Sequence, residues 1–145
     1  MDEAAKDTGQ VGVVIVTHTD YGARLLKAAE FIIGAQDACR SVSVDMTHEV
    51  DKILVAMKTA IKETDTGAGV LILTDMFGGT PTNLSLSLLG EGNLEVLTGV
   101  NLPMLIKILT SRQKPLQTLA SEAKIAGCQG IVVAGEVLRS KVAEG

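Results

Sequence analysis

The stretch V-G-V-V-I-V-T, residues 11–17, decides the fold class of this chain. It is a continuous apolar and mostly β-branched run, which is typical of a strand buried on both faces of a parallel sheet. A second run of this kind, V-L-I-L-T, covers residues 70–74. We expect these two strands to be neighbours at the centre of an open parallel sheet.

Further strands and helices are predicted around this central pair. Strand patterns cover residues 41–44 and 94–98, and a last strand is predicted at 131–138. Apolar residues recur at helical spacing between the strands, which indicates βαβ units. Helices are predicted at 25–33, 50–61 and 80–89, and two more open at Pro103 and Pro115. The fold class is therefore α/β, a three-layer open sheet of four parallel central strands with helices on both faces and a C-terminal edge strand.

The composition fits one such domain and excludes several functions. The chain has 145 residues, 46% of them hydrophobic, and we place the domain at 11–138, between tails at 1–10 and 139–145. A net charge of −4 and only three aromatic residues argue against nucleic-acid binding. No apolar run approaches the ~20 residues of a membrane span, and the N-terminus lacks a signal-peptide pattern. We therefore expect a cytoplasmic protein.

The sequence lacks the common nucleotide and metal motifs. There is no G-x-x-x-x-G-K-[ST], no G-x-G-x-x-G after the first strand and no G-x-S-x-G elbow. Cys39 and Cys128 are far apart, without a C-x-x-C or a histidine at ligand spacing. We interpret both cysteines as reduced and mostly buried, and we predict no cofactor and no metal site.

Two reactive side chains follow the two central strands. His18 ends the first strand and Asp75 the second. Ligand sites of open sheets lie outside the carboxyl ends of such a pair, so we expect these side chains to meet. Asp75 would then fix one ring nitrogen of His18 and leave the lone pair of the other facing outward. The alternative is that His18 only caps a helix. His48 has no glycine loop and no paired acid, and we interpret it as structural or exposed.

The loop D-M-F-G-G-T-P after the second central strand adds a candidate anion site. Gly78 and Gly79 free the backbone, Thr80 is predicted as the helix N-cap, and Pro81 suits the first helical position. Free amides at such a helix start bind anions. The alternative is a tight turn that binds nothing. A phosphate cradle without nucleotide motifs suggests a phosphoryl group carried on the protein, with His18 as its carrier.

Three segments together resemble a known family. They are V-G-V-V-I-V-T-H-T-D, V-L-I-L-T-D-M-F-G-G-T-P-T-N and G-V-N-L-P-M-L, in this order. Over residues 11–138 the chain resembles the EIIA component of the mannose-type (mannose/fructose/sorbose) sugar phosphotransferase system. The resemblance implies a cytoplasmic phosphotransferase that accepts a phosphoryl group from phospho-HPr and passes it to an EIIB partner, which serves a membrane sugar permease. The acceptor is expected to be a separate chain.

The resemblance also implies roles for individual residues. His18 matches the phosphorylated residue, through Nε2, and Asp75 matches its hydrogen-bonded partner. Gly79 and Thr80 match the positions that hold the phosphate, with Gly78 beside them. The family usually has glycine after the active histidine, whereas this chain has Thr19. The substitution puts the backbone geometry of the loop in question, and it adds a hydroxyl that can reach the phosphate.

The resemblance further implies a homodimer in which the C-terminal strand crosses to the neighbour's sheet, and residues 131–138 match that strand. The apolar pair Met76 and Phe77 belongs either to a docking surface or to the core.

Two other functions stay open at this point. A receiver-like domain would carry phosphate on Asp75, but it would need an acidic pair after the first strand, where Thr17 and His18 stand. A regulatory module that reads HPr phosphorylation without transporting sugar would keep His18. The related subunit that serves dihydroxyacetone kinase fits less well, because the loop reads D-M-F-G-G-T-P.

Overall fold

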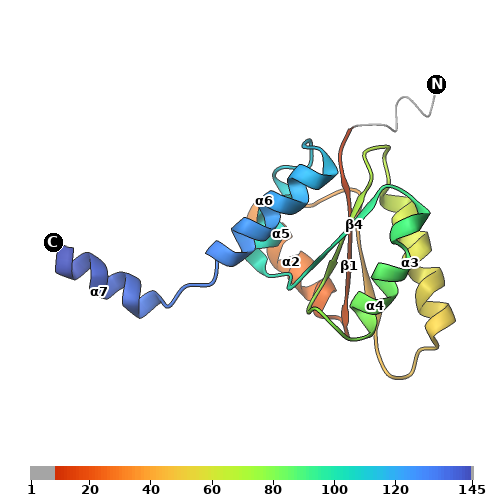
Figure 1. Ribbon diagram of the computed structural model, residues 1–145, viewed down its shortest axis with the longest axis horizontal. Coiled ribbons are helices and arrows are strands. Elements are labelled where there is room, and N and C mark those ends of the chain that lie inside the picture. The colour runs from red at the N-terminus through yellow and green to blue at the C-terminus, as the bar shows by residue number, and fades with distance from the viewer. Residues whose placement is uncertain (1–8, 145) are drawn as a thin grey trace.

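The computed structural model describes residues 9–144 and has the predicted alternation of strands and helices (Figure 1). Its strands are β1 (Gly12–His18), β2 (Cys39–Val44), β3 (Val70–Thr74) and β4 (Leu94–Thr98). Its helices are α2 (Tyr21–Ile33), α3 (Val50–Thr64), α4 (Thr80–Ser87), α5 (Leu102–Leu109), α6 (Leu116–Gln129) and α7 (Ala134–Glu144), and the 3-10 helix η1 (Leu89–Glu91) follows α4.

The strands form one sheet in the order β2-β1-β3-β4, and every neighbouring pair is parallel. The prediction that β1 and β3 are the central pair is confirmed. Both strands are buried along their length except at His18. The chain leaves β1 toward one edge of the sheet and returns to β3 on the other side. The switch point of the sheet therefore lies between the carboxyl ends of β1 and β3.

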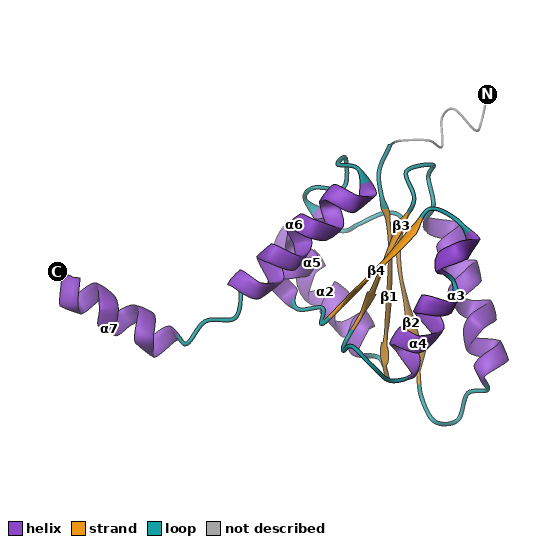
Figure 2. Cartoon of the chain, viewed as in Figure 1, coloured by secondary structure: helices purple, strands orange, loops and turns teal. Residues whose placement is uncertain are grey.

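Helices cover both faces of the sheet, as predicted (Figure 2). Helices α2, α5 and α6 lie on one face, and α3 and α4 lie on the other. Val13 and Ile15 pack into the core under the first group, while Val14 and Val16 pack into the core under the second. Each fully buried side chain of this kind contributes roughly 1.5–3 kcal/mol. Strand β1 is thus anchored from both sides, which fixes the position of its last residue, His18.

The predicted helices are confirmed, with differences at their ends. Helix α2 begins at Tyr21, directly after the polar turn, and α3 continues to Thr64. Pro103 lies in the first turn of α5, and Pro115 immediately precedes α6. Both prolines therefore mark helix starts, where their missing N–H costs no hydrogen bond.

The predicted edge strand at 131–138 is wrong. Residues 131–133 have no regular structure, and the following residues form α7. The β-branched run Ile131–Val133 suggested a strand, but 134–144 contain mostly good helix formers, and a helix satisfies its backbone groups locally. Figure 1 shows α7 projecting away from the sheet and its covering helices. None of its residues is buried, and Ile131 and Leu138 are largely exposed.

The predicted tails are only partly described. Residues 1–8 lie outside the described part of the chain. The carbonyl of Gln10 accepts a hydrogen bond of 2.6 Å from Thr66 Oγ1. Residues 139–144, predicted as a tail, continue α7. The domain limits 11–138 stay a prediction. Within residues 9–144, no helix has the length and apolarity that a bilayer crossing requires.

A buried arginine joins the strands at the end of the sheet opposite His18. The Arg112 guanidinium donates to the carbonyls of Val11, Asp37 and Ala38 at 2.8, 2.6 and 2.6 Å. Cys39 is buried nearby, as predicted, and burial raises the pKa of its thiol to about 11. Cys128 is exposed, so its predicted burial is wrong.

Candidate functional site

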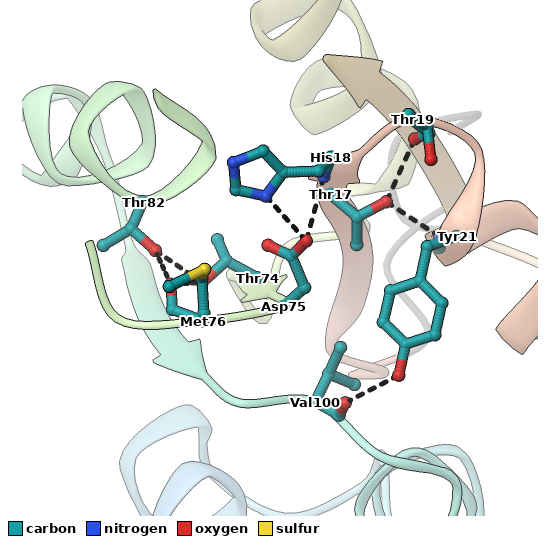
Figure 3. Close-up of polar contacts among 10 residues, drawn as sticks. Thr17, His18, Thr19, Tyr21, Thr74, Asp75, Met76, Thr82 and Val100 are labelled. Atoms are coloured by element: carbon teal, nitrogen blue, oxygen red, sulfur yellow. Dashed lines mark hydrogen bonds and ion pairs between the residues drawn. The ribbon is translucent and has the colours of Figure 1, made fainter. Parts of the chain in front are cut away.

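His18 and Asp75 meet at the switch point of the sheet, as the sequence predicts. His18 is the last residue of β1, and Asp75 directly follows β3. Asp75 Oδ2 lies 2.8 Å from His18 Nδ1 and accepts a hydrogen bond of 3.0 Å from the His18 backbone N–H (Figure 3). One carboxylate oxygen thus holds both the ring and the backbone of His18. The parallel pairing of β1 and β3 brings the two residues together.

The hydrogen bond to Asp75 determines what the imidazole can do. With the proton on Nδ1 and shared with Oδ2, the lone pair of Nε2 is available as a nucleophile. The His18 side chain is 48% exposed, whereas that of Asp75 is 14% exposed. Burial raises the pKa of the Asp75 carboxyl, but the hydrogen bonds from His18 lower it more, so it lies below its ordinary value. Asp75 Oδ1 is buried and has no hydrogen-bond partner among the described residues.

Gly78 and Gly79 shape the loop that faces the His18 ring. Their φ angles are +102° and +84°, a region that side chains rarely adopt. A β-carbon at Gly79 would lie 3.2 Å from both Cε1 and Nε2 of His18. At Gly78, a β-carbon would meet nothing within 4 Å. Both glycines are needed for the turn, but only Gly79 lies against the ring.

The predicted N-cap at Thr80 is wrong, because Gly79 occupies the cap position and Thr80 is the first residue of α4. The Gly79 carbonyl accepts the helical hydrogen bond from Asn83 N–H at 3.0 Å, and no side chain caps the helix. The positive φ of Gly79 lets the chain enter α4 one residue earlier than expected. No side chain therefore caps the first-turn amides of α4, and the cap residue Gly79 lies against the His18 ring.

Thr19 has a left-handed backbone, with φ of +54°. This conformation is unusual for a β-branched residue. Two hydrogen bonds hold it: Thr19 N–H donates to the Val44 carbonyl at 2.8 Å, and Thr17 Oγ1 donates to the Thr19 carbonyl at 3.2 Å. Thr17 Oγ1 also accepts from Gly22 N–H at the start of α2. The departure from glycine at position 19 is accommodated by a strained turn that its neighbours hold in place.

A pocket of about 400 Å³ opens beside the His18 ring. Thr19 and Thr80 line it together with residues of β2, α3 and the loop between them: Val44, Asp45, Met46, His48, Val50 and Ile53. A larger hollow of about 570 Å³ runs along β2 and α3 but does not include His18. The smaller pocket is the one that brings the predicted phosphate-binding threonines together.

His48 has a paired acid, contrary to the expectation from the sequence. Its Nδ1 lies 3.3 Å from Asp45 Oδ1, and its side chain is 49% exposed. Hydrogen bonds from Thr47 are the main cause of a lowered pKa of the Asp45 carboxyl. The spacing D-x-x-H in the loop before α3 is the signal that could have predicted this pair. The interpretation of His48 as exposed is consistent with the structure.

The surroundings of Asp75 do not fit the alternative of a receiver-like phosphoaspartate site. His18, not an acidic pair, lies beside it. Among residues 9–144, no group of three or more His, Cys, Asp or Glu side chains is placed to hold a metal ion.

Met76 and Phe77 are 54% and 79% exposed, so the alternative that they belong to the core is wrong.

The fold and the site together define an open parallel α/β protein with an imidazole–carboxylate pair at its switch point. The family model EIIA-man, described as PTS system fructose IIA component, matches residues 12–125. The chain belongs to this family, and it is an EIIA component of the mannose family of the sugar phosphotransferase system. The resemblance read from the sequence is confirmed, although the match ends before residue 138.

Individual relatives agree with this assignment. The PTS system mannose-specific EIIAB component of Escherichia coli (strain K12) is 32% identical over 103 residues, which are 70% of this chain and 32% of the relative. This chain therefore spans about a third of that relative's length. The PTS system fructose-specific EIIA component of Bacillus subtilis (strain 168) is 28% identical over 130 residues, covering 88% and 89% of the two chains.

A solved structure of an EIIA component also has this fold. The crystal structure of phosphotransferase system component EIIA from Streptococcus agalactiae superposes with a TM-score of 0.80 at 27% identity. The match covers 87% of this chain and 98% of that one.

Proposed function

We propose that this chain is a cytoplasmic phosphohistidine carrier, in which His18 Nε2 accepts a phosphoryl group from phospho-HPr and passes it to an EIIB partner. The observation that carries the proposal is the double hydrogen bond from His18 to Asp75 Oδ2, which leaves Nε2 beside Gly79. The membrane sugar permease takes part only indirectly, through EIIB.

In the proposed step, phosphorus moves between two imidazole nitrogens. The Nε2 lone pair of His18 forms the new P–N bond while the P–N bond of the donor's phosphohistidine breaks, and that electron pair returns to the donor nitrogen. Positive charge develops on the His18 ring as Nε2 bonds phosphorus. The Asp75 carboxylate stabilises this charge through Nδ1–H and keeps the ring in the correct tautomer. Positioning and charge stabilisation supply most of the rate.

The phosphoryl oxygens need hydrogen-bond donors around Nε2. The loop of Gly78 and Gly79 and the first turn of α4 offer backbone amides, and the helix start adds a partial positive charge. Thr80 and Thr19 line the pocket beside His18 and can each donate a hydroxyl. We assign these four residues to phosphate binding. The step requires no metal and no cofactor of the chain's own.

Partner proteins must reach Nε2 directly. The His18 side chain is half exposed, and the apolar side chains of Met76, Phe77 and Met46 lie exposed on the two loops that flank it. Exposed apolar side chains around a reactive group are a common feature of docking surfaces. This surface supports alternate docking of HPr and EIIB. The net charge of −4 argues against nucleic acid as a partner.

We further propose that the carrier is a homodimer formed through its C-terminal segment. Residues 131–144 extend from α6 with their apolar side chains exposed, including Ile131, Val133, Leu138 and Val142. Such a segment gains stability by packing on another subunit. Exchange of this segment between subunits does not require the strand that the sequence predicted.

Labelling with phosphoenolpyruvate, enzyme I and HPr tests the carrier function. We expect one phosphoryl group, mapped by mass spectrometry at neutral to basic pH to His18, and acid-labile but base-stable. His48→Ala should still carry the label on His18, whereas His18→Ala should not be labelled, while both remain folded. Full labelling of His18→Ala, or acyl phosphate on Asp75, would refute the assignment. Subsequent transfer to EIIB separates a transport role from a purely regulatory one.

A further inference from the structure

Two buried threonines, Thr74 and Thr82, contact the loop that carries Asp75. Thr82, in the first turn of α4, is 1% exposed, and Thr74, the last residue of β3, is fully buried. Their hydroxyl oxygens lie 2.8 Å apart, and Thr82 Oγ1 donates to the Met76 carbonyl at 2.5 Å (Figure 3). This network connects α4, β3 and the residue that directly follows Asp75.

Because each hydroxyl has a single proton, the donor and acceptor of each hydrogen bond in this network can be assigned. Each hydroxyl has one proton, and that of Thr82 goes to the Met76 carbonyl. Thr74 Oγ1 lies 3.5 Å from the same carbonyl but only 2.8 Å from Thr82 Oγ1, so Thr74 donates to Thr82. The Thr82 hydroxyl is therefore the main donor to the Met76 carbonyl within the described network, and Thr74 Oγ1 offers only a longer contact of 3.5 Å.

The Thr82 bond differs from the usual hydroxyl contact inside a helix. Ser85, one turn later in α4, is also buried, and its Oγ donates to the Pro81 carbonyl four residues back at 2.7 Å. The Thr82 hydroxyl instead crosses to the loop before the helix. Ser85 stabilises α4 itself, whereas Thr82 fixes the loop relative to α4.

The position of Asp75 depends on this loop. Asp75 lies between Thr74, which is fixed in the sheet, and Met76, whose carbonyl Thr82 holds. The Asp75 side chain hydrogen-bonds to His18 through Oδ2, and its Oδ1 has no hydrogen-bond partner among the described residues. The backbone on either side of Asp75 therefore sets where Oδ2 lies relative to His18 Nδ1.

We propose that Thr82 is a positioning residue, which acts through the Met76 carbonyl to hold Asp75 in hydrogen-bonding distance of His18 Nδ1. The inference rests on the proposed role of the His18–Asp75 pair. Loss of the Thr82 hydroxyl leaves the Met76 carbonyl without its main donor and lets the loop move, so the Nδ1–H tautomer of His18 is held less firmly.

Three variants test the inference with two independent measurements. Thr82→Val removes the hydroxyl at nearly constant shape, Thr82→Ser restores it, and Ser85→Ala removes a buried hydroxyl of the same helix as a matched control. The first measurement is the ¹⁵N chemical shifts of the His18 ring, which report the tautomer without any partner protein. The second is the rate of labelling by phospho-HPr.

We expect Thr82→Val to lower the Nδ1–H population of His18 and to slow labelling by about tenfold or more, as small misplacements of reacting groups do. Thr82→Ser should restore both, and Ser85→Ala should change neither by more than about twofold. Unchanged ring shifts in Thr82→Val, or equal changes in Ser85→Ala, would overturn the inference. If the wild-type protein is not labelled but the ring shifts change as expected, the proposed function fails and the inference stands.

Discussion

Gly79 lies directly against the His18 ring, since a β-carbon on this glycine would lie 3.2 Å from both Cε1 and Nε2. Asp75 holds the ring at Nδ1, on the other side of Cε1. The imidazole is therefore confined between a carboxylate that follows β3 and a glycine at the start of α4. Only a residue without a side chain leaves room at Nε2 for the phosphoryl group that we propose His18 carries.

Replacing Gly79 by alanine should block phosphorylation more than it destabilises the fold. Gly79→Ala puts a methyl group at Nε2, and we expect labelling to slow by about 100-fold. Gly78→Ala is the matched comparison for the steric effect: it keeps the backbone amide assigned to phosphate binding, its φ is also positive, and its β-carbon would meet nothing within 4 Å. Both variants should lose about 1–2 kcal/mol of stability from the left-handed backbone. Equal losses of labelling in the two variants would contradict a specific role for Gly79.

Asp75→Asn should slow phosphoryl transfer without preventing folding. The amide keeps a similar shape but loses the charge that favours Nδ1–H and stabilises the ring as Nε2 bonds phosphorus. We expect a decrease of up to about four orders of magnitude, the effect of an Asp→Asn change on the orienting carboxylate of a Ser-His-Asp triad. Quench-flow kinetics with phospho-HPr measure this rate. Unchanged kinetics would remove Asp75 from the mechanism.

The same pair should make stability depend on pH in acid. The pKa of Asp75 is lower in the folded protein than its ordinary value of 3.8. A carboxyl with a lowered folded pKa contributes stability above the unfolded pKa, and this is lost as pH falls through the folded pKa. The wild-type protein should therefore be more stable than Asp75→Asn near neutral pH, and the difference should shrink below about pH 4. Urea titrations across this range give the comparison, and a constant difference would argue against the pair.

Thr19→Gly should stabilise the fold and slow the reaction. Glycine relieves the positive φ at position 19, and we expect a gain of about 0.5–1 kcal/mol after the entropic cost of glycine. Ala38, with φ of +49° and no branched side chain, provides the control, and Ala38→Gly should gain less. Labelling should slow a few-fold because the Thr19 hydroxyl is lost, and Thr19→Ser should retain it. Thermal melts and labelling rates together test both effects, and labelling of Thr19→Gly at the wild-type rate would remove Thr19 from phosphate binding.

Deletion of residues 131–145 should weaken dimerisation and leave the sheet intact. Helix α6 ends before this segment, with Gly130 N–H bonded to the Ala126 carbonyl, so truncation after Gly130 spares its last turn. Sedimentation velocity at several concentrations would show the shift to monomer. A shorter deletion of 139–145 keeps Ile131–Val133 and should weaken the dimer less. An unchanged dimer in the longer deletion would exclude this segment from the interface.

The sequence was sufficient to predict the centre of the fold and the site. Continuous apolar runs mark β1 and β3 because strands buried on both faces tolerate few polar residues. Once these two are neighbours, the residues that follow them must meet, and so His18 and Asp75 could be paired from order alone. The glycines of the loop after β3 could be assigned because only they adopt its φ angles freely.

Other features depend on contacts that local sequence patterns do not contain. Arg112 is buried because it meets the carbonyl of Val11, 101 residues away, and nothing in its own segment predicts this partner. The strand predicted at 131–138 is wrong because the β-branched residues Ile131–Val133 favour a strand locally, whereas the residues that follow are mostly helix formers and form α7. The role of Thr82 cannot be predicted from the sequence because its acceptor, the Met76 carbonyl, is a backbone group that any sequence would supply.

The hydrogen bonds to Asp75 Oδ2 have a consequence for both halves of the proposed cycle. His18, the proposed nucleophile, is fixed to β1 and β3, the two most buried strands of the sheet, and not to a mobile loop. Donor and acceptor proteins therefore encounter the same preset ring orientation. Binding of either partner therefore does not have to orient the His18 ring. In the proposed cycle, the relative stabilities of the phosphohistidines on the three proteins determine the direction of phosphoryl transfer.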